Sequence, residues 1–195
     1  MATLGNTTSP PNGGYEFDDF GNCQFWDPYT MPAGGGIVTA ISVYVAGHLA
    51  TATVDFAVWG STALLVHSGS FSLAADNHNP EQVRTQFWTT KALTPTYVPA
   101  GTVNLGFWTS GHVIWTGNTS GATNFQRSVG SIGSIAFGGS EGNALGVYIT
   151  YTPGGIAHVR RTSSWHTGTV SDRRSSAWAN ARVRDRRTST WVDAS

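Results

Sequence analysis

The sequence predicts an all-β protein: an antiparallel β-sandwich followed by a carboxyl-terminal region of β-hairpin repeats. Three observations lead to this prediction. Apolar residues recur with a period of two in several short segments, and no segment has a convincing helical apolar stripe. Charged residues make up only 11% of the chain, whereas glycine accounts for 24 of 195 residues. Near the end of the chain, one short unit occurs three times at a constant interval.

The clearest period of two lies between residues 37 and 59. In the first half, the apolar positions of one parity are Ile37, Ile41, Val43 and Val45. In the second half they are Val54, Phe56 and Val58, and Gly47 lies in the turn-rich stretch between the halves. β-branched and aromatic residues at alternate positions are typical of paired strands with one buried face. Two such strands need a second layer to be stable, so the rest of the chain is expected to supply one.

Further strands are expected at short, regular spacing, separated by turn residues. The expected ranges are 63–66, 70–73, 83–90, 103–108, 113–115 and 145–151. Residues 74–81 are expected to form a polar loop, and Pro95 and Pro99 to separate two strands. The Gly-, Ser- and Asn-rich segment 117–142 is expected to be a long surface excursion, where function often lies. About eight strands in this arrangement predict an antiparallel sandwich.

Composition divides the chain into three regions. Residues 1–14 are rich in Gly, Pro and hydroxyl side chains and are expected to form an amino-terminal arm. Residues 15–155 form the predicted sandwich, and residues 156–195 the predicted tail. The sandwich begins with an aromatic patch between Tyr15 and Tyr29, interleaved with aspartates. These aromatic residues either plug one end of the sandwich or form a surface for a partner.

The order of several phrases in the body resembles the jelly-roll modules of bacteriophage tail and fibre proteins and of some bacterial surface proteins. The phrases are Met-Pro-Ala-Gly at 31–34, Phe-Ala-Val-Trp at 56–59, Val-Pro-Ala-Gly at 98–101, Val-Asn-Leu-Gly-Phe-Trp at 103–108 and Val-Tyr-Ile-Thr-Tyr-Thr at 147–152. The resemblance covers roughly residues 25–152. It implies a jelly-roll form of the sandwich and a place in a phage virion.

The tail contains three copies of an Arg-Arg-x-Ser-x-Trp-like unit with a spacing of 13 residues. The shared residues are Arg160, Arg161 and Trp165; Arg173, Arg174 and Trp178; and Arg186, Arg187 and Trp191. A period of 13 suits a strand, a tight turn and a second strand. Each unit has too little apolar surface to fold alone, so the repeats are expected to stack on each other, on the body or across identical chains. The units resemble the carboxyl ends of minor tail proteins from phages that infect actinobacteria.

Charge is divided between the body and the tail. Residues 1–157 contain three basic and eight acidic residues, net −5, and residues 158–195 contain eight arginines and three aspartates, net +5. This asymmetry favours contact between surfaces of opposite sign, within the chain, between copies or with an anionic partner. The tail arginines and tryptophans could bind nucleic acid, but Asp172 and Asp185 directly precede two of the Arg pairs, which argues against a phosphate surface. The repeats are therefore expected to act in assembly.

Residues that would support catalysis or a cofactor are sparse. The six histidines are scattered, Cys23 has no histidine nearby in the sequence, and no phosphate-binding glycine pattern or nucleophile elbow occurs. A calcium site within 16–19 or 76–79 is conceivable from the density of oxygen ligands, and an ordinary polar loop is the alternative. We expect no enzyme activity, no cofactor and no metal. A single cysteine, no secretory signal and no membrane-length apolar run predict a protein that is made and folds in a cytoplasm. The resemblance to phage proteins implies that this is the host cytoplasm and that the protein is then located in the virion.

Exposed aromatic rings beside amide side chains are the usual elements of a sugar site. The candidates for glycan binding are Trp88, Trp108, Trp115 and Tyr97. Each could equally lie in the core or at a subunit interface.

Three functions remain open from the sequence. The first is a non-enzymatic virion structural protein, a minor tail or tail-tip protein that assembles as a homo-oligomer, most simply a homotrimer, contacts other virion proteins and touches cell-wall glycan of the host. The second is a carbohydrate-binding receptor-recognition module, and the third is a capsid decoration or head-fibre protein. None of the three requires a membrane or nucleic acid.

Overall fold

The structure is a computed structural model of all 195 residues. It describes residues 1–8, 16–18, 22–48, 51–76, 88–115, 117–118, 123–126, 129–133, 135, 139–141 and 144–154 of the amino-terminal and central parts. In the tail it describes the backbone of residues 156–161, 164–169, 171–174, 177–180, 184–187 and 190–193.

Every regular element among the described residues is a β-strand, which confirms the all-β prediction. The long strands of the body are β3 (Cys23–Met31), β4 (Gly36–His48), β5 (Ala52–Trp59), β9 (Trp88–Val98), β10 (Gly101–Thr109) and β16 (Val147–Pro153). The short ones are β1 (Ala2–Gly5), β2 (Glu16–Asp18), β6 (Leu64–His67), β7 (Phe71–Leu73), β8 (Ala75–Asp76), β11 (Val113–Trp115), β12 (Gly117–Asn118), β13 (Thr123–Gln126), β14 (Gly139–Glu141) and β15 (Ala144–Leu145).

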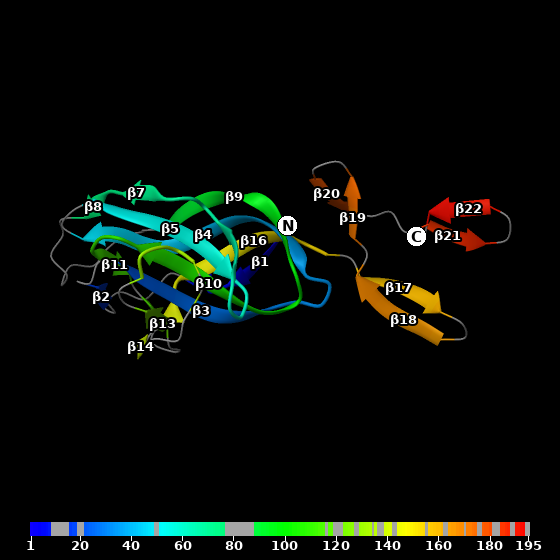
Figure 1. The fold of residues 1–195 in the computed structure, drawn as a ribbon, viewed down its shortest axis with the longest axis horizontal. Coiled ribbons are helices and arrows are strands. Elements are labelled where there is room, and N and C mark those ends of the chain that lie inside the picture. Colours follow the sequence, from blue (N-terminus) through cyan, green and yellow to red (C-terminus); the bar gives the residue numbers. More distant parts are fainter. Residues whose placement is uncertain are drawn as a thin grey trace.

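Two sheets pack face to face in the body, as the antiparallel sandwich prediction requires (Figure 1). In the first sheet, β1 pairs with β16, β16 with β4, and β4 with β9; β11, β2 and β8 extend it at the His48 end of β4. In the second sheet, the order is β14-β13-β3-β10-β5-β6, and β7 also pairs with β5. The pairs are nested along the chain, from the outermost pair to the innermost. The first strand, β1, pairs with the last body strand, β16; inside this pair, β3 pairs with β10, β4 with β9, and β5 with β6 and β7. All of these pairs are antiparallel.

Alternate residues of the facing strands fill the space between the sheets. Val54, Phe56 and Val58 are completely buried, as their shared parity predicts. Ile41, Val43 and Val45 are also buried, but Ile37 is not; Val38 replaces it in the core. The reason is a register shift between Val38 and Ala40 where β4 pairs with β9, which reverses the inward parity at the start of β4. The period of two therefore predicts the core correctly on one side of the bulge only.

Strand β9 differs from its predicted range. It continues through Pro95 to Val98, whereas the sequence places a break at Pro95. Thr96 pairs with Val38 and Ala92 with Ala40, so Pro95 lies in the bulged segment between them. A proline in a bulge removes no ladder hydrogen bond, which explains why the strand tolerates it. The first part of the expected 83–90 strand, residues 83–87, lies outside the described residues.

Two segments expected to lie outside the sheets belong to them. Within the predicted arm 1–14, residues 2–5 form the edge strand β1, paired with β16. Within the aromatic patch, residues 23–31 form β3, which pairs with β10 along its whole length. Phe25 lies in the core, and Trp26 lies on the outer side of the second sheet. The side chains of Tyr15, Phe17 and Phe20, which belong to the same predicted patch, lie outside the described residues. Long-range pairing with β10 is what identifies β3, and no local pattern contains that information.

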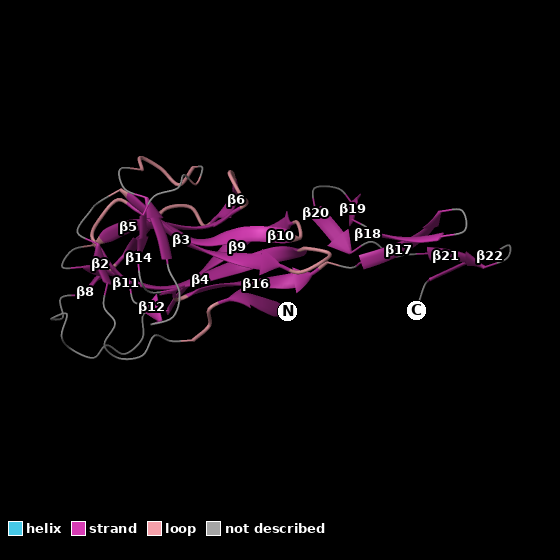
Figure 2. Cartoon of the chain, turned by 90° about the horizontal axis from the view of Figure 1, so that it is seen from below, coloured by secondary structure: helices cyan, strands magenta, loops and turns pink. Residues whose placement is uncertain are grey.

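The tail strands pair only within the tail among the described residues. β17 (Ile156–Arg161) pairs with β18 (Ser164–Thr169), β19 (Ser171–Arg174) with β20 (Ala177–Asn180), and β21 (Arg184–Arg187) with β22 (Thr190–Asp193). Figure 2 shows these pairs beyond one end of the sandwich. Among the residues whose side chains the structure describes, the buried residues of the core lie between positions 23 and 151.

Candidate functional surfaces

Where β1, β16, β4 and β9 pair, the outward positions of the first sheet carry no charged residue. Its outward positions are Thr3, Ser42, Tyr44, Trp88, Thr90, Ala92, Tyr148 and Thr150, and we call this set the uncharged face. Strands β1, β4, β9 and β16 contain a single charged residue, Lys91. The Lys91 ammonium lies 3.8 Å from the centre of the Phe71 ring in the second sheet, so this side chain crosses the edge of the sandwich. Exposed sheet surfaces normally carry charged residues, which makes this face unusual.

Three aromatic rings form a cluster at the end of the uncharged face where β9 and β16 begin. Trp88 contacts Tyr44 edge to face at 5.5 Å between ring centroids and Tyr148 at 5.1 Å. The backbone at Gly146 approaches this cluster so closely that an added Cβ would lie 2.8 Å from the Cβ of Tyr44. Tyr44 is consequently buried at 6% exposure, and Trp88 and Tyr148 are half-buried. Beside them, the hydroxyls of Ser42 and Thr90 are hydrogen-bonded at 2.8 Å.

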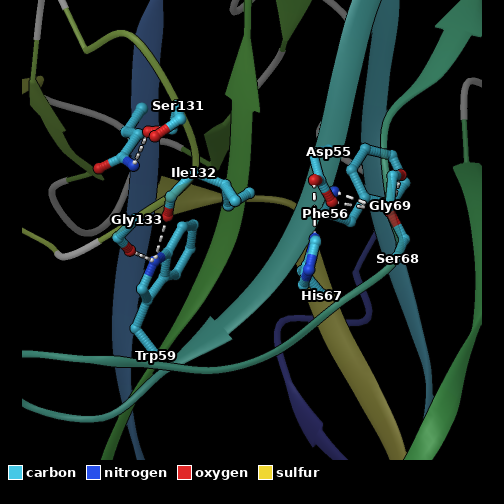
Figure 3. Close-up of polar contacts among 10 residues, drawn as sticks. Asp55, Phe56, Trp59, His67, Ser68, Gly69, Ser131, Ile132 and Gly133 are labelled. Atoms are coloured by element: carbon cyan, nitrogen blue, oxygen red, sulfur yellow. Dashed lines mark hydrogen bonds and ion pairs between the residues drawn. The ribbon is translucent and has the colours of Figure 1, made fainter.

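The outer side of the second sheet is covered by the chain itself. Residues 129–133 and 135, which we call the strap, lie over Trp26, Ala57 and Trp59 and contribute Ile132 and Ile135 to this small apolar cluster. The Trp59 indole N–H donates to the carbonyl oxygens of Ile132 at 3.0 Å and Gly133 at 2.8 Å (Figure 3). Two more side chains of the sheet hold the strap, since Trp108 Nε1 donates to Val129 O at 2.7 Å and Gln24 Nε2 to Ser131 O at 3.1 Å. The strap therefore acts as a third layer.

Replacing Trp59 with phenylalanine is expected to loosen the strap while leaving the sandwich intact. The change removes the indole N–H that donates to the carbonyl oxygens of Ile132 and Gly133. Its loss should lower the free energy of unfolding by about 1–2 kcal/mol. Amide hydrogen exchange of residues 129–135 should accelerate. Trp108→Phe, which removes a single bond to the strap, should give a smaller effect. Unchanged exchange in Trp59→Phe would mean that the indole bonds do not hold the strap.

Asp55, His67 and Ser68 form a polar cluster at the edge of the same outer side. Nδ1 of His67 lies 2.8 Å from Oδ2 of Asp55, and the Ser68 hydroxyl donates to Oδ1 of Asp55 at 3.2 Å and accepts from the Phe56 N–H at 3.0 Å (Figure 3). These residue types also occur in hydrolytic triads, but there the serine hydroxyl is bonded to the imidazole. Here Ser68 is bonded to the carboxylate instead. The cluster therefore links Asp55 on β5 to His67 and Ser68 at the end of β6. In this geometry the imidazole is not positioned to take a proton from the serine hydroxyl.

The carboxyl group of Asp27, on β3, is buried. Asp27 is 4% exposed; its Oδ2 accepts from the Leu145 N–H at 2.8 Å, and its Oδ1 has no hydrogen-bond partner among the described residues. Burial raises the pKa of Asp27 to about 7, and the bonds from Thr123 and Leu145 oppose this rise only in part. Burial and the nearby Asp27 carboxyl also raise the pKa of Tyr29. The sequence analysis did not single out Asp27, because an aspartate within a strand pattern gives no local sign of facing inward.

The four predicted glycan-binding residues do not form one site. Trp88 and Tyr97 both lie on β9, but Tyr97 is near its far end, where its hydroxyl donates to Gly34 O at 3.2 Å. Trp108 lies on the opposite side of the molecule under the strap. Trp115 belongs to the core and is 1% exposed, so its ring has no face accessible to a sugar. Of the four, Trp88 is the one that shares a cluster with other surface aromatic rings.

The tail hairpins repeat one backbone register. The first arginine of each pair lies directly opposite the tryptophan of the same unit: Arg160 and Trp165, Arg173 and Trp178, Arg186 and Trp191. The assembly role of these residues, and that of Arg161, Arg174 and Arg187, stays a prediction.

Within the part of the chain that the structure describes, no group of three or more His, Cys, Asp or Glu residues could hold a metal ion. The same part contains no helix long and apolar enough to cross a membrane. Comparison of the chain with protein-family models, with curated proteins and with solved structures finds no match.

Proposed function

We propose that the chain is a non-enzymatic structural protein of a bacteriophage virion, a minor tail or tail-tip protein that assembles with copies of itself. The observation that carries this proposal is the uncharged face, because a sheet surface without charges suits permanent burial against another subunit. The virion itself is inferred from the resemblance of the body phrases and the tail units to phage proteins.

We further propose that the sandwich is a jelly roll. Nested antiparallel pairing supports this proposal: β1 with β16, β3 with β10, β4 with β9, and β5 with β6 and β7. A long hairpin that is rolled into two sheets gives this order of partners. Jelly rolls are common in viral coat and receptor-binding proteins, which agrees with the proposed location.

The tail is proposed as a second, electrostatic part of the assembly. β16 ends at Pro153, which pairs with Gly36 at the start of β4, so the tail leaves the body at this end. At the other end of β4, about 40 Å away for an extended strand, β8 with Asp76 pairs with residues 47–48, and β11 separates β4 from β2 with Glu16 and Asp18. This separation favours contact between the basic tail and a neighbouring molecule over contact with the chain's own acidic end.

The experiment that tests the proposed function is light scattering of the purified full-length chain. A stable homo-oligomer, with a trimer as the expected mass, supports the proposal. A well-folded monomer at micromolar concentration contradicts it.

Ending the chain after Gly155 should weaken the oligomer and remove its salt dependence. The full chain should dissociate more readily as salt rises from about 0.05 M to about 0.5 M, because screening weakens contacts of the arginine-rich tail. The shortened chain lacks the arginines of the tail and should show no such dependence. Equal salt dependence of the two chains, measured by analytical ultracentrifugation, would rule out the tail as the electrostatic part.

A carbohydrate-binding module is the second candidate, and the exposed side of the Tyr44–Trp88–Tyr148 cluster favours it. Saturable binding to cell-wall glycan that is lost in Trp88→Ala, with folding intact, would support this candidate. Trp115→Ala does not test it, since Trp115 is in the core. A capsid decoration or head-fibre protein would share the same surfaces, and labelling of intact particles in electron microscopy would separate that location from the tail.

A further inference from the structure

We infer that the uncharged face is the surface through which one copy of the chain binds another. This inference rests on the proposed self-assembly and adds which surface and which side chains make the contact. It concerns the outward side of β1, β16, β4 and β9, and its occupant is a second copy of the chain.

The distribution of charge is the first argument. The body has a net charge of −5, yet the outward positions of these four strands are Thr, Ser, Tyr, Trp and Ala. A second copy can therefore cover this face without like-charge repulsion at the contact and without removing an ion from water, although the bodies repel elsewhere. A strongly acidic or basic partner would find no complementary charge here.

The contrast between the two outer sides is the second argument. The second sheet carries Trp26, Trp59 and Trp108 on its outer side, and the strap of the same chain covers them with apolar contacts and hydrogen bonds. Among the described residues, no comparable segment covers the first sheet, where Trp88 and Tyr148 are half-buried and Thr3, Thr90 and Ala92 are exposed.

The size of the face is the third argument. Three strands paired over the seven residues of β16, and the four residues of β1, spaced about 4.8 Å apart, cover roughly 400 Å² of flat sheet. The relief of the side chains increases this area toward the ~800 Å² that each partner contributes to a standard interface. Aromatic side chains and few charges are the usual composition of such interfaces.

The test places an arginine in the middle of the face. Thr150 lies on the central strand β16, between Thr3 of β1 and Ala40 of β4. Thr150→Arg should raise the dissociation constant of the oligomer at least about 100-fold, because the new charge would be buried in a surface with no counter-ion. Thr102→Arg is the matched control, since Thr102 is an exposed threonine on β10 of the other sheet. The oligomer of this control variant should have the same mass as the wild-type oligomer. Thr3→Arg, on the exposed edge strand, repeats the test at a position where folding is easier to preserve.

The outcomes separate this inference from the proposed function. A wild-type oligomer that dissociates in Thr150→Arg and Thr3→Arg, but not in Thr102→Arg, with unchanged circular dichroism for all, supports the inference. A wild-type oligomer that all three variants retain overturns the inference and leaves self-assembly standing. A monomeric wild type overturns both. Loss of cell-wall glycan binding in Thr150→Arg without a change in mass would assign the face to glycan instead.

Discussion

Replacing Phe107 with alanine is expected to lower the free energy of unfolding by about 3–5 kcal/mol. Phe107 is completely buried, and its ring stacks on Phe25 at 5.1 Å and contacts Phe56 edge to face at 6.4 Å between ring centroids. The three residues come from neighbouring strands β10, β3 and β5 of the second sheet. The alanine variant would leave a cavity at the point where these strands meet the first sheet. Since domains of this size are stable by about 5–15 kcal/mol, the variant should be close to unfolding.

Urea denaturation followed by tryptophan fluorescence would measure this loss. Phe71→Ala is the matched control, because Phe71 is half-buried at the sandwich edge and should cost less. A loss below about 1 kcal/mol for Phe107→Ala would contradict the assignment of Phe107 to the centre of the core.

The Asp27→Asn variant is expected to be more stable than the wild type at pH 8 and similar to it near pH 4. Burial raises the pKa of Asp27 to about 7, well above the value of about 3.9 in an unfolded chain. The folded state therefore binds the proton more tightly than the unfolded state, and stability falls as the pH rises from about 4 to about 7. Asparagine carries no charge to desolvate, so it should add about 1–3 kcal/mol at pH 8 after allowing for one buried N–H group without a partner.

Thermal unfolding at a series of pH values would show the effect as a wild-type curve that declines over this range and a flatter curve for the variant. Asp55→Asn is the matched control. Both oxygens of Asp55 are bonded, to His67 and to Ser68, so its neutral form should not stabilise the protein. A wild type whose stability does not fall between pH 4 and pH 8 relative to Asp27→Asn would show that Asp27 is not buried as a raised-pKa group.

Local patterns predicted several elements because a period of two is a property of neighbouring residues. The pattern of Val54, Phe56 and Val58, and that of Val103, Leu105 and Phe107, each correctly predicts a buried strand face. The same reasoning failed at the start of β4, where the bulge at Val38 shifts the inward parity away from Ile37. A bulge arises from the pairing with β9, and β9 is more than 40 residues further along the chain.

The candidate surfaces were less predictable, because tryptophans look alike in a sequence. Trp88, Trp108 and Trp115 all follow an apolar strand pattern, yet they lie on the uncharged face, under the strap and in the core, respectively. Their positions depend on which strand pairs with which and on where residues 129–135 return to the sheet. Asp27 was missed for the same reason.

The sequence by itself determined the all-β class, the buried side of the most regular strands, the 13-residue repeat and the charge difference between body and tail. These properties depend on composition and on neighbours along the chain. Only the tertiary structure decided that β1 and β3 join the sheets, that the strap covers one outer side, and that four strands place a surface without charges on the other. Each of these depends on contacts between residues far apart in the sequence, whose free energy is gained only after the chain has closed the loops between them.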